Sequence, residues 1–295
     1  MNSLVKKIIS NRFNVWIIFF SIVLFLVSCN KFQKKPSSQL FKITPKERVW
    51  MNKFFNDLMI DEHGIYTLWG SKPLTLIIID HYTEKERQEY YESLSASEKE
   101  NGIIIEKYDL PENWKKWEEI CPRFPFKKYL LFKSDLYDDP HASFIFFVDI
   151  FKTALVIQEN YETFKKAVGF DFNPLEVVLE MQQNNSKFWE KLKGSAVHWG
   201  LLYGFGPKNS WTFHWKNFEH PSSCENFLQS FEGRFSNPPI KGKVKFALSN
   251  LEIPSFISFD ENDEIIDQYK KQRLYIQNIY KGKDFLDATL EKLMQ

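Results

Sequence analysis

The stretch SFIFFVDIFKTALVIQENYETFKKAV, residues 143–168, places a strand directly before a helix. Residues Ser143–Val148 are aromatic and β-branched after the serine, which is typical of a buried strand. Asp149 follows as a helix cap, because its carboxylate can accept hydrogen bonds from the first free backbone amides. We expect one helix from there to Val168. Its apolar residues repeat at helical spacing and predict one buried stripe: Ala154, Ile157, Tyr161, Phe164 and Val168.

Capping residues indicate helix starts along the rest of the chain. Thr44 with Glu47 and Thr83 with Glu86 have the spacing of a capping box, in which each residue caps the other's backbone amide. Further starts are expected at Pro111, Asn173, Ser186 and Asp284. The expected strands outside the opening stretch are Ile65–Trp69, Leu74–Ile79, Ile103–Lys107, Lys128–Phe132, Lys243–Ser249 and Ser255–Phe259. The predicted class is therefore α+β, mostly helical with a small sheet of short strands.

Two predictions concern how neighbouring elements join. The first two expected strands, Ile65–Trp69 and Leu74–Ile79, flank Gly70–Pro73, so we expect a β-hairpin there. The helix opened by Ser186 is expected to run to Tyr203 and to end at the glycines that follow. Its apolar stripe is Trp189, Leu192, Ala196, Trp199 and Tyr203.

The N-terminus has the layout of a signal peptide. Basic residues without an acid occupy residues 1–14, and the chain is then apolar from Val15 to Val27 except for Ser21. A membrane-spanning helix needs roughly 20 apolar residues, so this run is too short for one and matches the hydrophobic region of a signal peptide.

The apolar run ends in Leu26-Val27-Ser28-Cys29. This resembles the lipobox of bacterial lipoproteins. The resemblance implies cleavage before Cys29 by signal peptidase II, a diacylglycerol on the Cys29 sulfur, and further acylation of the new amino group, with fatty acids such as palmitate. We therefore expect a lipoprotein signal peptide at 1–28, a lipidated tether at 29–43 and a single α+β domain at 44–295.

The same resemblance implies where in the cell the protein is located. The protein is expected in the cell envelope, held to a membrane by lipid, and Asn30 favours the outer membrane if the cell has one. The mature chain also resembles lipoproteins of intracellular bacteria that have no assigned activity. The segments that carry this resemblance are GIYTLWGSKPLT, HWGLLYGFGPKNSW and IYKGKDFLDATLEKL.

Charge and cysteine content narrow the classes of partner. Lysine plus arginine number 39 and aspartate plus glutamate 38, so the net charge gives no reason to expect nucleic-acid binding. No motif implies a cofactor. Beyond Cys29, the chain has Cys121 and Cys224, which could pair in an oxidising compartment, but the sequence leaves their distance open.

The segment SAVHWGLLYGFGPKNSWTFHW, residues 195–215, holds the candidate ligand-binding residues. They are His198, Trp199, Tyr203, Asn209, Trp211 and Trp215. Aromatic faces in a groove could stack on sugar rings or hold acyl chains. The alternative is that Trp199 and Tyr203 only fill the core, because both belong to a helical stripe.

Metal ligation is not expected in this region. His220 and Cys224 stand four residues apart, but Pro221 argues against a helix that would bring them together. His198 and His214 have no paired ligand motif beside them.

The acidic residues of the middle region favour a polar turn over a functional site. Asp135, Asp138 and Asp139 lie near His141, a composition that calcium sites and glycosidases also use. Their spacing matches no calcium-binding loop.

Three classes of function remain. A binding or structural role for an anchored envelope protein is expected, because no motif commits the chain to a reaction and no catalytic residue can be named. The alternative is an envelope hydrolase that acts on peptidoglycan or lipid through residues 195–224. A third is an assembly partner for other membrane proteins, which would show a large exposed apolar patch.

Overall fold

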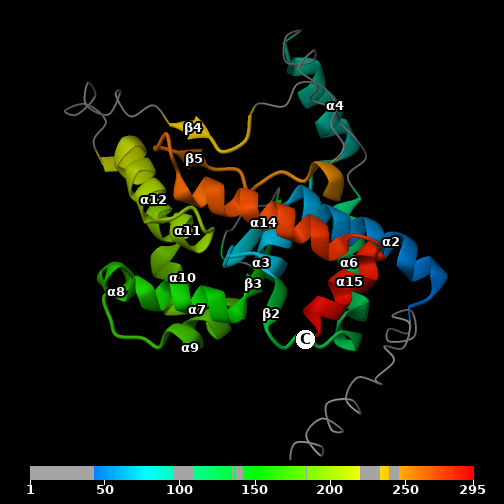
Figure 1. Cartoon of the computed structure of the whole chain (residues 1–295), viewed down its shortest axis with the longest axis horizontal. Helices are drawn as coiled ribbons and strands as arrows, with labels where there is room; N and C mark the ends of the chain where they lie inside the picture. Colours follow the sequence, from blue (N-terminus) through cyan, green and yellow to red (C-terminus); the bar gives the residue numbers. More distant parts are fainter. Residues whose placement is uncertain are drawn as a thin grey trace, which may run out of the picture. The chain divides into compact units, whose positions relative to one another are not determined.

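The computed structural model describes residues 43–95, 109–134, 136, 142–183, 185–219, 233–238 and 246–295. The described residues from Thr44 onward belong to one compact unit, Thr44–Gln295. Helices surround a small antiparallel sheet, so the predicted α+β class is confirmed (Figure 1). The predicted signal peptide, the lipidated Cys29 and nearly all of the tether lie outside the described residues.

Helical elements make up most of the unit. In chain order they are α2 (Pro45–Asn56), η2 (Asp57–Asp61), α3 (Gly64–Trp69), α4 (Glu84–Ser93), α6 (Leu110–Ile120), η3 (Cys121–Arg123), α7 (Ile150–Glu159), α8 (Tyr161–Val168), α9 (Pro174–Leu179), η4 (Glu180–Gln182), α10 (Lys187–Leu192), α11 (Ala196–Leu202), α12 (Pro207–His214), η5 (Trp215–Glu219), η6 (Leu248–Asn250), α14 (Glu264–Tyr280) and α15 (Phe285–Leu293). The capping boxes at Thr44 and Thr83 are both formed, as their spacing predicts.

Strands form two antiparallel sheets. They are β1 (Leu74–Asp80), β2 (Tyr129–Ser134), β3 (Ala142–Asp149), β4 (Arg234–Phe235) and β5 (Ile257–Ser258). The larger sheet has the order β1-β3-β2, with Ile77 opposite Ile145 and Phe132 opposite Phe146. The smaller sheet pairs β4 with β5. Four of the predicted strands, those near residues 74–79, 128–132, 143–148 and 255–259, are confirmed.

One hydrophobic core joins the central strand to the helices that follow it. Phe146 of β3 packs on Trp199 of α11, with ring centroids 5.7 Å apart. Phe164 of α8 packs on Phe188 of α10 at 6.1 Å. Each fully buried side chain of this size contributes roughly 1.5–3 kcal/mol relative to exposure. This core supports α11, which bears the candidate site.

The predicted hairpin at Gly70–Pro73 is wrong, because Ile65–Trp69 lies in the helix α3. Short apolar runs do not separate a buried helix from a strand, and this one is buried almost throughout. Gly64 begins the helix where a Cβ would lie 2.6 Å from the carbonyl oxygen of Leu58, so the close approach of α3 to η2 requires glycine.

The predicted continuous helix from Asp149 to Val168 is broken into α7 and α8 at Asn160. The Asn160 side chain donates to the carbonyl oxygen of Val156 at 2.9 Å and completes the end of α7. Asparagine favours such local bonds over helix continuation. The apolar spacing still places Ile157 and Phe164 in one core, because the break is short.

The predicted helix from Ser186 to Tyr203 is also divided, into α10 and α11. The carbonyl oxygen of Leu192, at the end of α10, accepts from the Ser195 amide at 2.9 Å and from the indole Nε1 of Trp199 at 3.0 Å. Pro207 opens α12, where the sequence suggested only an end. The described part of the expected strand Lys243–Ser249, residues 246–249, forms no strand, and Leu248–Asn250 is the short helix η6. The expected strand Ile103–Lys107 lies outside the described residues.

Acid is expected to destabilise the fold through His63. His63 is half-buried in a left-handed conformation, with φ of 58°. Burial, and secondarily the charge of Lys72, lowers the pKa of His63 to about 4. The unfolded chain, with a histidine pKa near 6.5, therefore binds the proton first as pH falls. Stability should be complete above pH 6.5 and should fall as pH drops toward 4.

The comparison of wild type with His63→Asn tests this expectation, because asparagine tolerates the left-handed conformation. Urea unfolding should show wild type losing about 2 kcal/mol more than the variant between about pH 7 and pH 5. Equal losses in both proteins would contradict the assignment to His63.

Candidate functional site

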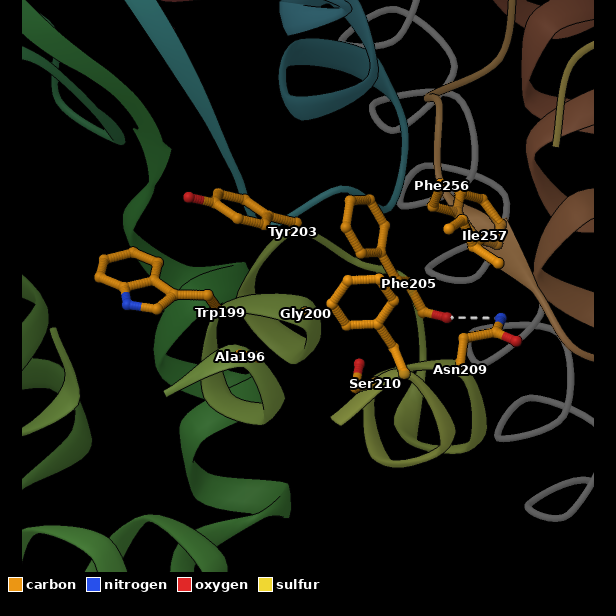
Figure 2. Close-up of a pocket in the computed structure, with 10 residues that line it drawn as sticks. Ala196, Trp199, Gly200, Tyr203, Phe205, Asn209, Ser210, Phe256 and Ile257 are labelled. Atoms are coloured by element: carbon orange, nitrogen blue, oxygen red, sulfur yellow. Dashed lines mark hydrogen bonds between the residues drawn. The ribbon is translucent and has the colours of Figure 1, made fainter. Parts of the chain in front are cut away.

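An aromatic pocket lies where α11, α12 and β5 meet (Figure 2). Its cavity has a volume of about 310 Å³. The large side chains that line it are Trp199, Tyr203, Phe205, Phe213, Phe256 and Ile257. None of the described residues that line it carries a charge. The pocket is therefore suited to uncharged groups.

The helix α11 contributes one face to this pocket. Ala196, Gly200 and Tyr203 lie four and three residues apart along the chain and share that face. Gly200 lets α12 approach closely, since a Cβ there would lie 2.5 Å from the Oγ of Ser210. The Ser210 hydroxyl donates to the carbonyl oxygen of Gly206 at 2.7 Å. The small residues on α11 thus create both the helix contact and the hollow beside it.

The turn between α11 and α12 depends on glycine. Gly204 and Gly206 have φ angles of 77° and 80°, in the left-handed region that glycine adopts without strain. The Tyr269 hydroxyl of α14 donates to the Gly204 carbonyl oxygen at 3.0 Å and holds the turn in place. The turn directs Phe205 toward Phe256, and their stacked rings lie 5.2 Å apart.

Asn209 connects three elements around the pocket. Its Nδ2 donates to the Phe205 carbonyl oxygen at 2.9 Å, the bond dashed in Figure 2, and to Asp263 Oδ2 at 2.8 Å. Its Oδ1 accepts from the Phe259 amide at 3.2 Å. Asp263 also caps α14, through Oδ1 and the Ile265 amide. One buried amide thus fixes α12 to the residue that follows β5 and to the start of α14.

Three of the six candidate residues line this pocket. Trp199 and Tyr203 stack with centroids 5.8 Å apart, and Tyr203 continues the row to Phe205 at 5.7 Å. Asn209 is 4% exposed. Trp199 is also part of the hydrophobic core. This residue therefore both packs in the core and lines the pocket, the two roles that the sequence left as alternatives.

His198 does not line this pocket but lies against α8. Its Nε2 donates to the Thr163 carbonyl oxygen at 3.2 Å, and its Nδ1 accepts from the Ser195 hydroxyl. Its ring packs edge-on against Phe164 at 4.7 Å. Burial lowers the pKa of His198, with a smaller contribution in the same direction from the charge of His214. Both ring nitrogens have partners, which is the arrangement of a histidine satisfied in the interior.

Trp211 and Trp215 are not among the residues that line this pocket either. Trp211 is half-buried against the core, and Trp215 is 46% exposed. Their centroids lie 6.0 Å apart. The predicted groove that would contain both of them with Trp199 is not this cavity.

The sequence reasoning missed the pocket residues contributed by other segments. Phe256 and Ile257 belong to the strand β5, far along the chain from α11. No local pattern pairs them with Trp199. The helical spacing of Ala196, Gly200 and Tyr203 could have identified the small-residue face.

A larger depression, of about 690 Å³, lies around η4 and the start of α10. Its walls mix aromatic and acidic side chains, and two of the acids, Asp171 and Glu180, have partners within the fold. Lys165 pairs with Asp171 at 2.6 Å, and the Ser186 hydroxyl donates to Glu180 at 2.9 Å. These two acids thus serve the fold, and we take the aromatic pocket as the candidate site.

Metal and catalytic predictions are tested only in part. Within the described ranges, no three His, Cys, Asp or Glu side chains are placed to hold a metal ion. The acidic turn residues Asp135, Asp138, Asp139 and His141, and also His220 and Cys224, lie outside the described residues. Cys121 is half-buried. Its pairing with Cys224 stays a prediction, because Cys224 is not among the described residues.

An apolar surface also occurs on the neighbouring helices α7 and α9. Phe151, Leu155, Leu175 and Leu179 are exposed there, between 40% and 60%. Their spacing places two on each helix one turn apart. Such a surface is compatible with the assembly role, although nothing in the described residues indicates what covers it.

The family models, the curated proteins and the solved structures give no match to this chain. Among the helices of the described ranges, none is long and apolar enough to cross a membrane. The site geometry and the sequence are therefore the basis for a function.

Proposed function

We propose that the chain is an envelope lipoprotein, anchored by acyl chains on Cys29, whose folded unit binds a small ligand in the aromatic pocket. The observation that carries the binding role is the pocket itself. Ligand sites are concave, mostly apolar and lined by aromatic side chains, with volumes of roughly 300–1,000 Å³. The cavity of about 310 Å³ is at the lower end of that range, so its ligand is a small molecule or a small part of a larger one.

The pocket is preformed, which supports binding over simple core packing. Its walls are fixed by Asn209 and by the bond from Tyr269 to Gly204. A rigid hollow lowers the entropy that a ligand loses on binding. Core side chains usually interdigitate without a void of this size.

The anchor rests on the sequence. The lipobox Leu26–Cys29 and the short apolar run before it support lipidation of Cys29. Two or three acyl chains hold a protein stably on a bilayer, whereas one is marginal. The membrane is then the first partner, with an envelope component or a protein as a further one. The outer membrane is the proposed location if the cell has one.

The hydrolase alternative has one local feature in its favour. Ser195 and His198 are hydrogen-bonded, as a serine nucleophile and its base would be. The His198 ring, however, packs against Phe164, and neither residue lines the aromatic pocket. Because the pair lies apart from the aromatic pocket, binding is the better-supported function of that pocket.

Filling the pocket is expected to abolish binding of a hydrophobic probe. Ala196→Phe places a ring in the hollow, and Ala167→Phe adds the same ring at an exposed position of α8. Titration with the dye anilinonaphthalene sulfonate, followed by fluorescence, should show a dissociation constant that is about tenfold higher, or no binding at all, for Ala196→Phe. Ala167→Phe should bind the dye as wild type does. Thermal unfolding of each variant checks the fold. Unchanged dye binding by a folded Ala196→Phe would exclude the pocket as the binding site.

A further inference from the structure

We propose that the group held in the aromatic pocket is a hydrocarbon chain of a lipid, and not a sugar ring. This inference rests on the proposed binding function and names its ligand class. Aromatic walls alone allow both classes, because sugar rings and alkyl chains both pack on aromatic faces. The hydrogen-bonding state of the lining residues distinguishes them.

The polar side chains of the pocket are already used by the protein. Trp199 has one donor, and it bonds to the Leu192 carbonyl oxygen. The Asn209 amide donates twice and accepts once within the fold. The Ser210 hydroxyl donates to Gly206. A bound sugar would bury hydroxyl groups without partners, which weakens binding strongly.

The Tyr203 hydroxyl is also directed elsewhere. Figure 2 shows the ring of Tyr203 between Trp199 and Phe205, with its oxygen pointing away from Phe205 and Phe256. The part of Tyr203 that contributes to the stacked row is therefore its apolar ring. The pocket presents hydrocarbon surface from this side as well.

An apolar cavity of this size favours hydrocarbon over water. Water needs two to four polar partners in a cavity, and apolar cavities of about 150 Å³ stay dry and bind apolar molecules. This cavity is larger, at about 310 Å³, and none of its described lining residues is charged. An ionised head group would lose its hydration inside the pocket, so the hydrocarbon chain of the lipid enters and its head group stays outside. Each buried methylene should raise affinity about fourfold.

Displacement of the bound dye by defined ligands tests this on the full chain. Octanoate and dodecanoate, below their micelle concentrations, should displace the dye, and dodecanoate should bind more tightly by about fourfold per added methylene until the cavity is full. Calorimetry at several temperatures should give a negative heat-capacity change for dodecanoate. Methyl glucoside and N-acetylglucosamine should displace no dye.

Variants tie the effect to the pocket. Ala196→Phe should lose dodecanoate binding and Ala167→Phe should keep it. Phe213→Ala enlarges the cavity and should shift the preferred chain to a longer one, a gain that a merely damaged fold cannot give. Dodecanoate binding that is unchanged in folded Ala196→Phe overturns the proposal.

A free fatty acid and a membrane lipid, the two possible sources of the hydrocarbon chain, give different results in the displacement experiment. Displacement by dodecanoate alone indicates a free fatty acid, and displacement by a dodecanoyl lysophospholipid alone indicates a membrane lipid. Both outcomes support a hydrocarbon ligand, whereas displacement by neither overturns it. Displacement by the sugars, without the lipids, overturns this inference and leaves the binding function standing. Dye binding that does not depend on Ala196 removes the binding function itself.

Discussion

Replacing Cys29 with alanine is expected to abolish incorporation of labelled palmitate and to release the protein from the membrane fraction. In the proposed lipoprotein the Cys29 thiol is the acceptor for the diacylglycerol, and each acyl methylene in the bilayer contributes roughly 0.8 kcal/mol to anchoring. Loss of the acyl chains removes this contribution. The measurement is metabolic labelling followed by separation of membrane and soluble fractions.

Cys121→Ala provides the matched control, because it removes a different thiol. Cys121 is half-buried, and its Sγ donates to the Glu118 carbonyl oxygen at 3.5 Å. Burial, and next the charge of Glu118, raises the pKa of Cys121, which makes the thiol less reactive. This variant should keep its label and stay on the membrane. Palmitate retained by Cys29→Ala would contradict the lipoprotein assignment.

Replacing Asn209 with alanine is expected to destabilise the folded unit by about 3 kcal/mol. The substitution removes three hydrogen bonds, one of them to the carboxylate of Asp263, and leaves the Phe259 amide without its side-chain partner. Buried groups that lose their partners cost about 1–3 kcal/mol each, although such losses are not additive. Chemical denaturation measures the change.

Asn217→Ala is the control for this variant. Asn217 is exposed and makes the same local bond, from Nδ2 to the carbonyl oxygen of Phe213 four residues earlier, at 2.7 Å. Its loss should cost less than about 1 kcal/mol, because water replaces the exposed partner. Similar losses for both variants would show that the Asn209 network does not hold α12 to β5.

Local capping explains why much of the helical structure could be predicted from the sequence. Thr44 with Glu47, Thr83 with Glu86, and Asp284 act on amides within their own first turn, so the residues that form each contact are adjacent in the sequence. The strand β3 could also be predicted, because its run of aromatic and β-branched residues favours a buried strand whichever neighbouring strand pairs with it. The helix starts could be predicted because their hydrogen bonds are local, and the strand because its burial requires no particular partner.

The breaks in the helices and the fold of Ile65–Trp69 depend on more distant contacts. The stripe from Trp189 to Tyr203 keeps helical spacing across the break, so spacing alone could not reveal it. The two helices remain joined across the break by the Trp199 indole, which donates to the Leu192 carbonyl oxygen. The α3 segment is helical because Gly64 allows it to pack against η2. Neither contact can be read from a repeat of apolar residues.

The candidate site divides in the same way. Trp199 and Tyr203 were named as candidates because aromatic faces can line a groove, and both line the pocket, although their helical spacing favoured the core. The opposite wall, Phe205 against Phe256, depends on the left-handed turn at Gly204. The sequence indicated that aromatic residues gather in this region, but the exposed position of Trp215 shows that richness in aromatic residues does not identify the cavity.

The most direct test of the hydrocarbon pocket is to locate a bound chain. Crystals of the mature lipidated protein grown with bromododecanoate would reveal the bromine by its anomalous scattering. We predict a peak inside the pocket, in contact with Trp199 or Phe256, that is absent when Ala196 is replaced by phenylalanine. A peak confined to the exposed faces of α7 and α9, with the aromatic pocket empty, would contradict the account.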